Sequence, residues 1–264
     1  MCDFYIYELD KILKSDMDEL VKIFGIVSAI ATAIAAFLTF RTLKEVKTQR
    51  ESMYMPDIII EEKQFFIYGA ETSKGISFCE FSIEKKKHGH LSEKFAFSKF
   101  SIDIFNIGLA TAKKVEVNFT FNTEKSILNI ENINKNIPLS KAVKINKTKT
   151  GIEFIGGEDS LKSGSMHFIN NQLQTKINHV LPINISDIPF KVELPMFILE
   201  LYTTTISQFW IDESQNREFP DFPPIKVKFT YLDIGNKKHK KKYQLYLSFN
   251  GGSNSEAWCS IKVK

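Results

Sequence analysis

The chain has 264 residues, 43% of them hydrophobic and 25% charged, which is typical of a folded globular protein and excludes a largely disordered one. A net charge of +4 is too small to indicate a nucleic-acid-binding protein from charge alone. The three cysteines, Cys2, Cys79 and Cys259, include no C-x-x-C pair, so neither a zinc knuckle nor a thioredoxin-type site is predicted. Their odd number favours a reducing compartment, and the sequence leaves a Cys79–Cys259 disulfide open.

The first predicted element is a transmembrane helix at residues 23–40, IFGIVSAIATAIAAFLTF. These eighteen residues contain no charge and lie between Lys22 and Arg41. At about 1.5 Å per residue they cover roughly 27 Å, close to the hydrocarbon thickness of a bilayer. The alternative is a buried helix of a soluble domain, which rarely runs so far without a charge. We therefore expect a single-pass protein with the lipid bilayer as its first partner.

Residues 1–22 form an acidic segment with six acidic and three basic side chains. A cleavable signal peptide instead begins with a short basic region, so we expect a retained anchor. Four basic residues follow the span closely: Arg41, Lys44, Lys47 and Arg50. Because an excess of Lys and Arg marks the cytoplasmic side, we expect the inner (cytoplasmic) membrane, with the C-terminal domain in the cytoplasm.

The transmembrane helix is predicted to continue into a stalk at residues 41–55. No Gly or Pro occurs from Ile26 to Met55, and Pro56 disfavours helical geometry at the residue before it. The sequence thus predicts one long helix ahead of the remaining domain.

Small residues on this helix predict a contact surface. Gly25, Ala29 and Ala33 recur every four positions, which lets two helices approach closely in a membrane. We expect a homo-oligomer that forms through this helix-association face. The alternative is an alanine-rich anchor without a partner helix.

Residues 56–264 are predicted to form one domain, an antiparallel β-sandwich or partly open barrel, so the fold class is mainly β. Alternating apolar residues and turn signals support this. The predicted strands cover residues 57–60, 64–68, 76–83, 100–105, 115–121, 197–202, 225–231 and 243–249. The last two form a hairpin around a turn at residues 233–236. Residues 124–180 show no clear period, and we expect short strands and long loops there.

Four short motifs give the chain a familiar layout: Gln49-Arg50-Glu51, Pro56-Asp57, Asn106-x-Gly108-x-x-x-Ala112-x-x-Val115 and Tyr231-x-Asp233-Ile-x-Asn236. In this layout the chain resembles a loose group of uncharacterised bacterial proteins with one spanning helix, a basic stalk and an immunoglobulin-like β-sandwich. Some anchored β proteins of similar layout act as membrane sensors or effectors in anti-phage systems, so the resemblance implies antiviral defence. It transfers no catalytic residue.

The sequence contains no recognisable catalytic or cofactor motif. Neither His-Glu-x-x-His nor Gly-x-Ser-x-Gly occurs, and the flexible, lysine-rich loop around His88 and His90 is a poor metal site. We therefore expect a non-enzymatic protein without a cofactor, acting as a sensor or effector that binds a protein partner or an anionic small ligand. Two alternatives stay open: an envelope assembly protein with an extracytoplasmic domain, and an anchored enzyme with a dispersed site.

The most basic segment lies in the late hairpin and is predicted to form an exposed turn. It contains Lys237, Lys238, Lys240, Lys241 and Lys242 around one histidine. Three hypotheses apply: a solvated edge that resists aggregation, contact with anionic lipid, and binding of a nucleotide or nucleic acid. Nucleic acid ranks last, because the nearby tyrosines alternate like core residues.

Overall fold

The computed structural model describes residues 2–72, 75–85, 99–149, 151–156, 165–168, 173–211, 218–253 and 256–264. The chain divides into two compact units, Met1–Tyr54 and Met55–Lys264. Each unit is described by itself.

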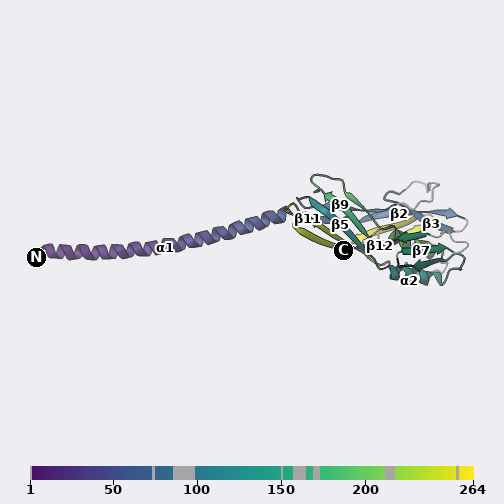
Figure 1. The fold of residues 1–264 in the computed structure, drawn as a ribbon, viewed down its shortest axis with the longest axis horizontal. Helices are drawn as coiled ribbons and strands as arrows, with labels where there is room; N and C mark the ends of the chain where they lie inside the picture. The colour runs from purple at the N-terminus through teal and green to yellow at the C-terminus, as the bar shows by residue number, and fades with distance from the viewer. Residues whose placement is uncertain are drawn as a thin grey trace. The chain divides into compact units, whose positions relative to one another are not determined.

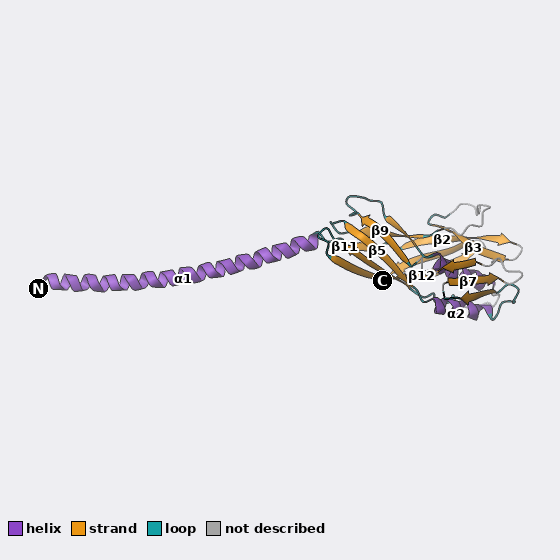
Figure 2. Cartoon of the chain, viewed as in Figure 1, coloured by secondary structure: helices purple, strands orange, loops and turns teal. Residues whose placement is uncertain are grey.

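The first unit is one uninterrupted helix, α1, over Cys2–Met53 (Figures 1 and 2). The prediction that the helix continues beyond the apolar run and ends before Pro56 is confirmed. Hydroxyl groups inside and beside the apolar run are satisfied within the helix. Thr32, Thr39 and Thr42 each donate to the carbonyl oxygen four residues earlier, at 2.8, 2.8 and 2.9 Å. The helix therefore exposes few unpaired polar groups along this stretch.

Among the described residues, one helical stretch is long and apolar enough to cross a membrane, Leu20–Glu51. None of its most apolar window is buried within the structure. An N-terminal signal sequence would also meet these criteria of length and composition.

The second unit is mainly β (Figure 2). Its described strands are β1 (Ile58–Ile60), β2 (Lys63–Thr72), β3 (Gly75–Ser82), β4 (Ser101–Asn106), β5 (Ala112–Thr120), β6 (Val143–Lys147), β7 (Gly151–Gly156), β8 (Ser165–Phe168), β9 (Gln174–Val180), β10 (Phe190–Glu193), β11 (Ile225–Leu232), β12 (Lys238–Ser253) and β13 (Glu256–Val263). Two helices accompany them, α2 (Thr123–Asn134) and α3 (Met196–Ile211).

The strands form a seven-stranded sheet in the order β3-β2-β13-β12-β11-β5-β9 and two three-stranded sheets, β1-β4-β10 and β6-β7-β8. Adjacent strands within these sheets are antiparallel, as expected of a sandwich or partly open barrel. The predicted hairpin is confirmed, since β11 pairs with β12 and Val227 lies opposite Tyr243. Its alternating apolar residues, including Val227 and Phe229, are buried on one face of the large sheet.

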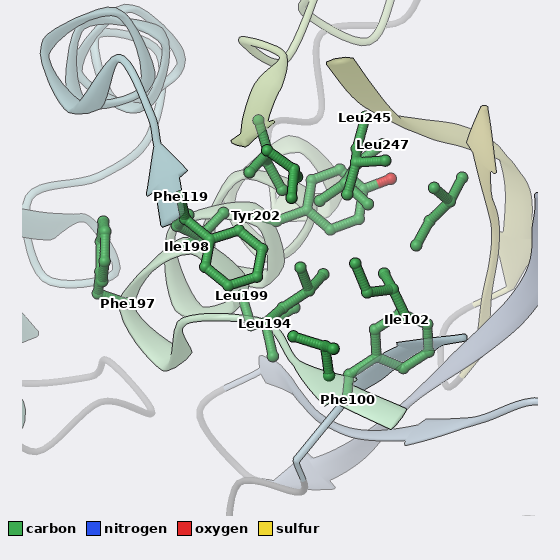
Figure 3. Packing of buried hydrophobic residues seen from close by; sticks show 14 of the residues in the cluster. Phe100, Ile102, Phe119, Leu194, Phe197, Ile198, Leu199, Tyr202, Leu245 and Leu247 are labelled. Carbon is green, nitrogen blue, oxygen red and sulfur yellow. The ribbon is translucent and has the colours of Figure 1, made fainter. Parts of the chain in front are cut away.

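The prediction of a strand at residues 197–202 is wrong. These residues lie in α3, whose side chains are buried from Phe197 to Gln208. A helix buried all round lacks the one-sided period that identifies helices from sequence, so its aromatic and β-branched residues resemble a strand. Figure 3 shows Leu199 and Tyr202 of α3 among the buried side chains of the core, which also include Leu245 and Leu247 of β12.

The expectation of only short strands and loops at residues 124–180 is also partly wrong, because α2 occupies the start of this segment. Asn122 caps the helix by accepting a hydrogen bond from the Lys125 backbone N–H at 3.1 Å. Ile127, Ile130 and Ile133 are buried at helical spacing. Short strands follow, as expected.

Cys259 on β13 is a buried free thiol, so the disulfide that the sequence left open is not formed. Burial raises the pKa of this thiol to about 12.

Candidate functional site

A buried asparagine holds the first residues of the β domain. Asn106, at the end of β4, is 1% exposed. Its side-chain oxygen accepts hydrogen bonds from the backbone N–H groups of Asp57 and Gly108, at 2.9 and 3.2 Å. Its amide nitrogen donates to the carbonyl oxygens of Ala110 and Val180, at 2.7 and 3.1 Å. All four hydrogen-bonding positions of the amide are thus occupied.

Gly108 permits the close approach of this segment. A Cβ atom at this position would overlap the Met55 carbonyl oxygen and lie 2.6 Å from the Asp57 backbone nitrogen. The neighbouring Ile107 donates its backbone N–H to the Asp57 carbonyl oxygen at 2.8 Å. Any side chain at position 108 would therefore displace the backbone of residues 55–57.

The β11–β12 hairpin binds the same segment. The Tyr231 hydroxyl donates to the Pro56 carbonyl oxygen at 3.2 Å, and the Tyr243 hydroxyl donates to the Ile58 carbonyl oxygen at 2.6 Å. The Lys241 ammonium group forms an ion pair with the Asp57 carboxylate.

Burial opposes the charge on Lys241, but the hydrogen bonds and charges of Asp57 and Tyr243 outweigh it and raise the lysine pKa. We call the five residues that hold this segment the N-terminal clamp: Asn106, Gly108, Tyr231, Lys241 and Tyr243.

The turn of the hairpin is fixed beside the clamp. The Asp233 carboxylate lies 2.8 Å from His239 Nε2 and accepts the Lys237 backbone N–H at 2.9 Å. The hydrogen bond from His239 is the main reason that the pKa of Asp233 is lowered, and the Lys237 bond adds to it. Asn236 takes the left-handed backbone conformation, with φ of 62°, which asparagine tolerates well.

Three of the four motifs behind the resemblance therefore meet in one place. Asn106-x-Gly108 and Tyr231-x-Asp233, from distant parts of the sequence, both contribute side chains or close contacts around the Pro56-Asp57 backbone. The sequence identified them separately as turns and strand faces.

The structure divides the predicted lysine cluster between two faces of a strand. The expectation that the cluster forms an exposed turn is wrong for all but Lys237, because β12 begins at Lys238. Lys238, Lys240 and Lys242 are exposed on the outer face of the large sheet. Lys241 lies on the opposite face, in the clamp. Side chains alternate along a strand, so one basic run supplies both faces.

Other lysines extend the outer face across five strands, from β9 to β13. Register places Lys228 of β11 directly opposite Lys242 of β12. Lys264 pairs with Gln244 through two backbone hydrogen bonds, and Lys262 lies opposite Tyr246. We call the exposed lysines on this side the lysine face: Lys176, Lys226, Lys228, Lys238, Lys240, Lys242, Lys262 and Lys264.

The lysine face contains little opposing charge. Glu116 of β5 lies on it, between Lys176 of β9 and Thr230 of β11. Within the described part of the chain, no ion pair joins a carboxylate to any lysine of this face. The face can therefore attract an anion with most of its positive charge uncompensated.

Sequence reasoning missed most of this face. Lys226 and Lys228 alternate with apolar residues along the first arm of the hairpin, and this alternation could have placed them on the exposed face. Lys176, Lys262 and Lys264 join the face only through pairing of strands distant in the sequence.

A cavity of about 550 Å³ lies between β4 and β9. Its lining combines aliphatic side chains, including Ile104, Ile177 and Ile188, with polar ones, including Lys176 and His179.

The described part of the chain contains no group of side chains that could bind a metal ion. No three His, Cys, Asp or Glu side chains there are placed to hold an ion. His88 and His90 lie outside the described residues.

The predicted helix-association face is sterically open. Gly25, Ala29 and Ala33 are exposed on α1, and a Cβ atom at Gly25 would meet nothing within 4 Å.

No family model, curated protein or solved structure matches the chain. In chain order, the protein has one apolar N-terminal helix followed by a β-rich domain, and one sheet face of that domain is lined by lysines.

Proposed function

We propose that this chain is a non-enzymatic, single-pass protein of the inner membrane whose cytoplasmic β domain binds a polyanionic partner through the lysine face. The observation that carries the proposal is the pairing of Lys228 with Lys242. Like charges directly opposite each other on neighbouring strands are destabilising, whereas favourable cross-strand pairs contribute about 0.2–1 kcal/mol. A bound anion would relieve this repulsion, so the arrangement favours the occupied state.

The apolar helix supports the membrane part of the proposal. It supplies an uncharged stretch of spanning length, and its threonine hydroxyls bond within the helix. The basic residues after this stretch, together with the buried free thiol of Cys259, support a cytoplasmic domain. Association through Gly25, Ala29 and Ala33 would let the protein act as a sensor or effector.

The binding test uses the full chain in nanodiscs of uncharged phosphatidylcholine, with inorganic polyphosphate as the probe. The variant carries Lys228→Thr and Lys242→Thr, since threonine is favourable in strands. A lysine beside an anionic surface contributes about 1 kcal/mol, so we expect the Kd to rise on the order of tenfold or more. Removing the like-charge pair should also raise the melting temperature of the unbound protein, by no more than roughly 4 °C.

The matched control is Lys144→Thr, because Lys144 is also an exposed strand lysine but lies on β6 of another sheet. It should leave polyphosphate binding unchanged. If the double variant binds polyphosphate as tightly as Lys144→Thr does, the lysine face is not the binding site.

The orientation is tested with a reporter enzyme that is active only outside the cytoplasm, fused after Lys264. We expect no activity from this fusion, and activity from a fusion before Cys2. Strong activity after Lys264 would instead favour an envelope assembly protein with an extracytoplasmic domain.

Self-association is tested with Ala29→Leu and Ala33→Leu, which place bulk on the helix-association face. Crosslinking between copies in the membrane should fall. Ile30→Leu is the control because it changes shape but not bulk on the same helix. Unchanged crosslinking in the alanine variants would contradict an oligomer through this face.

The resemblance to anchored bacterial proteins extends the proposal to anti-phage defence. We expect cells that produce the protein to lower the plating efficiency of some phages, and the Lys228→Thr/Lys242→Thr variant to lose this effect. Equal plating with and without the wild-type protein across a broad phage panel would count against defence.

A further inference from the structure

We infer that the polyanion bound by the lysine face is a single-stranded nucleic acid, a step that rests on the function proposed above. The observation that leads to it is a set of aromatic side chains on the same face as the lysines. A polyanion such as polyphosphate needs only positive charge, whereas unpaired bases also need flat apolar surfaces on which to stack.

Tyr246 is the first of these aromatic residues. It lies on the outer face of β12, directly opposite Lys262. The Lys264 ammonium group lies 5.2 Å from the centre of its ring, and its hydroxyl donates to the Gln244 side chain at 2.7 Å. The ring is therefore held in place among cationic groups.

The other tyrosines of the hairpin are not available for stacking. Tyr231 is buried, and both Tyr231 and Tyr243 belong to the N-terminal clamp, where their hydroxyls bond to the carbonyl oxygens of Pro56 and Ile58. The expectation that the tyrosines alternate like core residues thus holds for these two. Tyr246 differs because it follows Tyr243 by three residues along the strand, an odd number, so its side chain lies on the opposite face.

Trp258 provides a second aromatic surface. It is 41% exposed and lies on the outer face of β13. Register places it opposite Phe66 of β2. Trp258 precedes Lys262 by four residues on one strand, so about 14 Å separates their backbone positions. Aromatic and cationic groups thus share one face over a few nucleotides' length.

This combination favours single strands over the other polyanions. Each stacked base contributes about 1–3 kcal/mol regardless of its identity, while the lysines neutralise phosphates. In a duplex the bases are already stacked on each other, so a flat sheet face with exposed rings gains nothing from them. An anionic membrane offers phosphates without bases, and we treat it as the competing outcome of the test.

The experiment uses the full chain in phosphatidylcholine nanodiscs, with a mixed-sequence DNA oligonucleotide of twelve nucleotides as the probe. The chain has two tryptophans, so Trp210→Phe leaves Trp258 as the reporter. We expect the oligonucleotide to quench Trp258 fluorescence, and added salt to reverse the quenching.

The deciding variants are Tyr246→Ser and Trp258→Ser, with binding measured by oligonucleotide anisotropy. Together they should weaken oligonucleotide binding more than tenfold and change polyphosphate binding less than twofold. Phe190→Ser is the matched control, because Phe190 on β10 is 40% exposed but belongs to a different sheet. It should change neither.

The outcomes separate this inference from the proposed function. If the aromatic variants bind the oligonucleotide as well as wild type while Lys228→Thr/Lys242→Thr binds both probes poorly, the nucleic-acid inference is overturned and the proposed function stands. If phosphatidylserine vesicles displace the oligonucleotide and bind at lower concentration, a membrane surface replaces nucleic acid as the partner. If neither probe binds wild type, the proposed function fails as well.

Discussion

Replacing Asn106 by alanine should be among the most destabilising single changes in the β domain. The substitution removes four hydrogen bonds at a side chain that is 1% exposed. It leaves two backbone N–H groups and two carbonyl groups without their partner. A buried group left unpaired costs about 1–3 kcal/mol. If water reaches half of these groups through the space that the amide vacates, roughly 2–6 kcal/mol remains, a large fraction of a typical domain's 5–15 kcal/mol.

The assay is urea unfolding of the full chain in an uncharged detergent, followed by near-ultraviolet circular dichroism. Asn129→Ala is the control. Asn129 makes one hydrogen bond, to the Asp221 carbonyl oxygen at 3.0 Å, in an exposed position. Its loss should cost less than about 1 kcal/mol. Hydrogen exchange should also accelerate at the backbone N–H groups of Asp57 and Gly108 in Asn106→Ala.

A difference of less than about 1 kcal/mol between the two variants would refute the reasoning. It would mean that the backbone around Asp57 finds other partners when Asn106 is lost. The N-terminal clamp would then be dispensable for holding the first residues of the domain.

Three further changes test the core and the hairpin. The Tyr202 hydroxyl is buried beside only the weakly bonding Cys259 thiol, so Tyr202→Phe should leave the urea midpoint unchanged or raise it. Burial raises the pKa of the Cys259 thiol to about 12, so the folded protein holds little reactive thiolate at pH 8. In a variant with the other two cysteines replaced by serine, a thiol reagent at pH 8 should therefore react only as fast as the protein unfolds. His239 lowers the pKa of Asp233 below its usual 3.8, so Asp233 stabilises the fold above pH 3.8 and loses this effect as the pH falls through the lower, folded-state value. The destabilisation by Asp233→Asn should therefore be present at pH 7 and fade in acid, as measured by thermal unfolding.

The parts of the fold that could be predicted from the sequence are those specified locally. The long helix follows from an uncharged run without Gly or Pro, and the β11–β12 hairpin follows from two alternating arms around Asp233. The missed element, α3, is specified by its surroundings. Phe197 to Gln208 are buried on every side, so no alternation of polar and apolar residues marks the helix. Only the packing of sheets around it decides between helix and strand.

The candidate site was predictable to a similar degree. A run of lysines indicated a basic surface, but a run alone does not show which side chains share a face. Strand geometry sends Lys241 inward to Asp57 and Lys242 outward to Lys228. The remaining lysines and Trp258 arrive through pairing between strands far apart in the sequence, which one sequence read alone does not specify.

Strand β12 carries residues of both the lysine face and the N-terminal clamp, so the proposed ligand binding predicts coupling between the two. Its inward residues Lys241 and Tyr243 hold Asp57 and Ile58, while its outward residue Lys242 belongs to the lysine face. A ligand that neutralises Lys242 relieves repulsion with Lys228 and tightens the strand pair that also carries the N-terminal clamp. Linkage requires that any change in the clamp caused by the ligand be matched by an equal change in ligand affinity caused by the clamp. The segment that the clamp holds, Pro56 to Ile58, closely follows the end of α1 at Met53. If the helices associate as proposed above, this coupling would link their association to ligand binding.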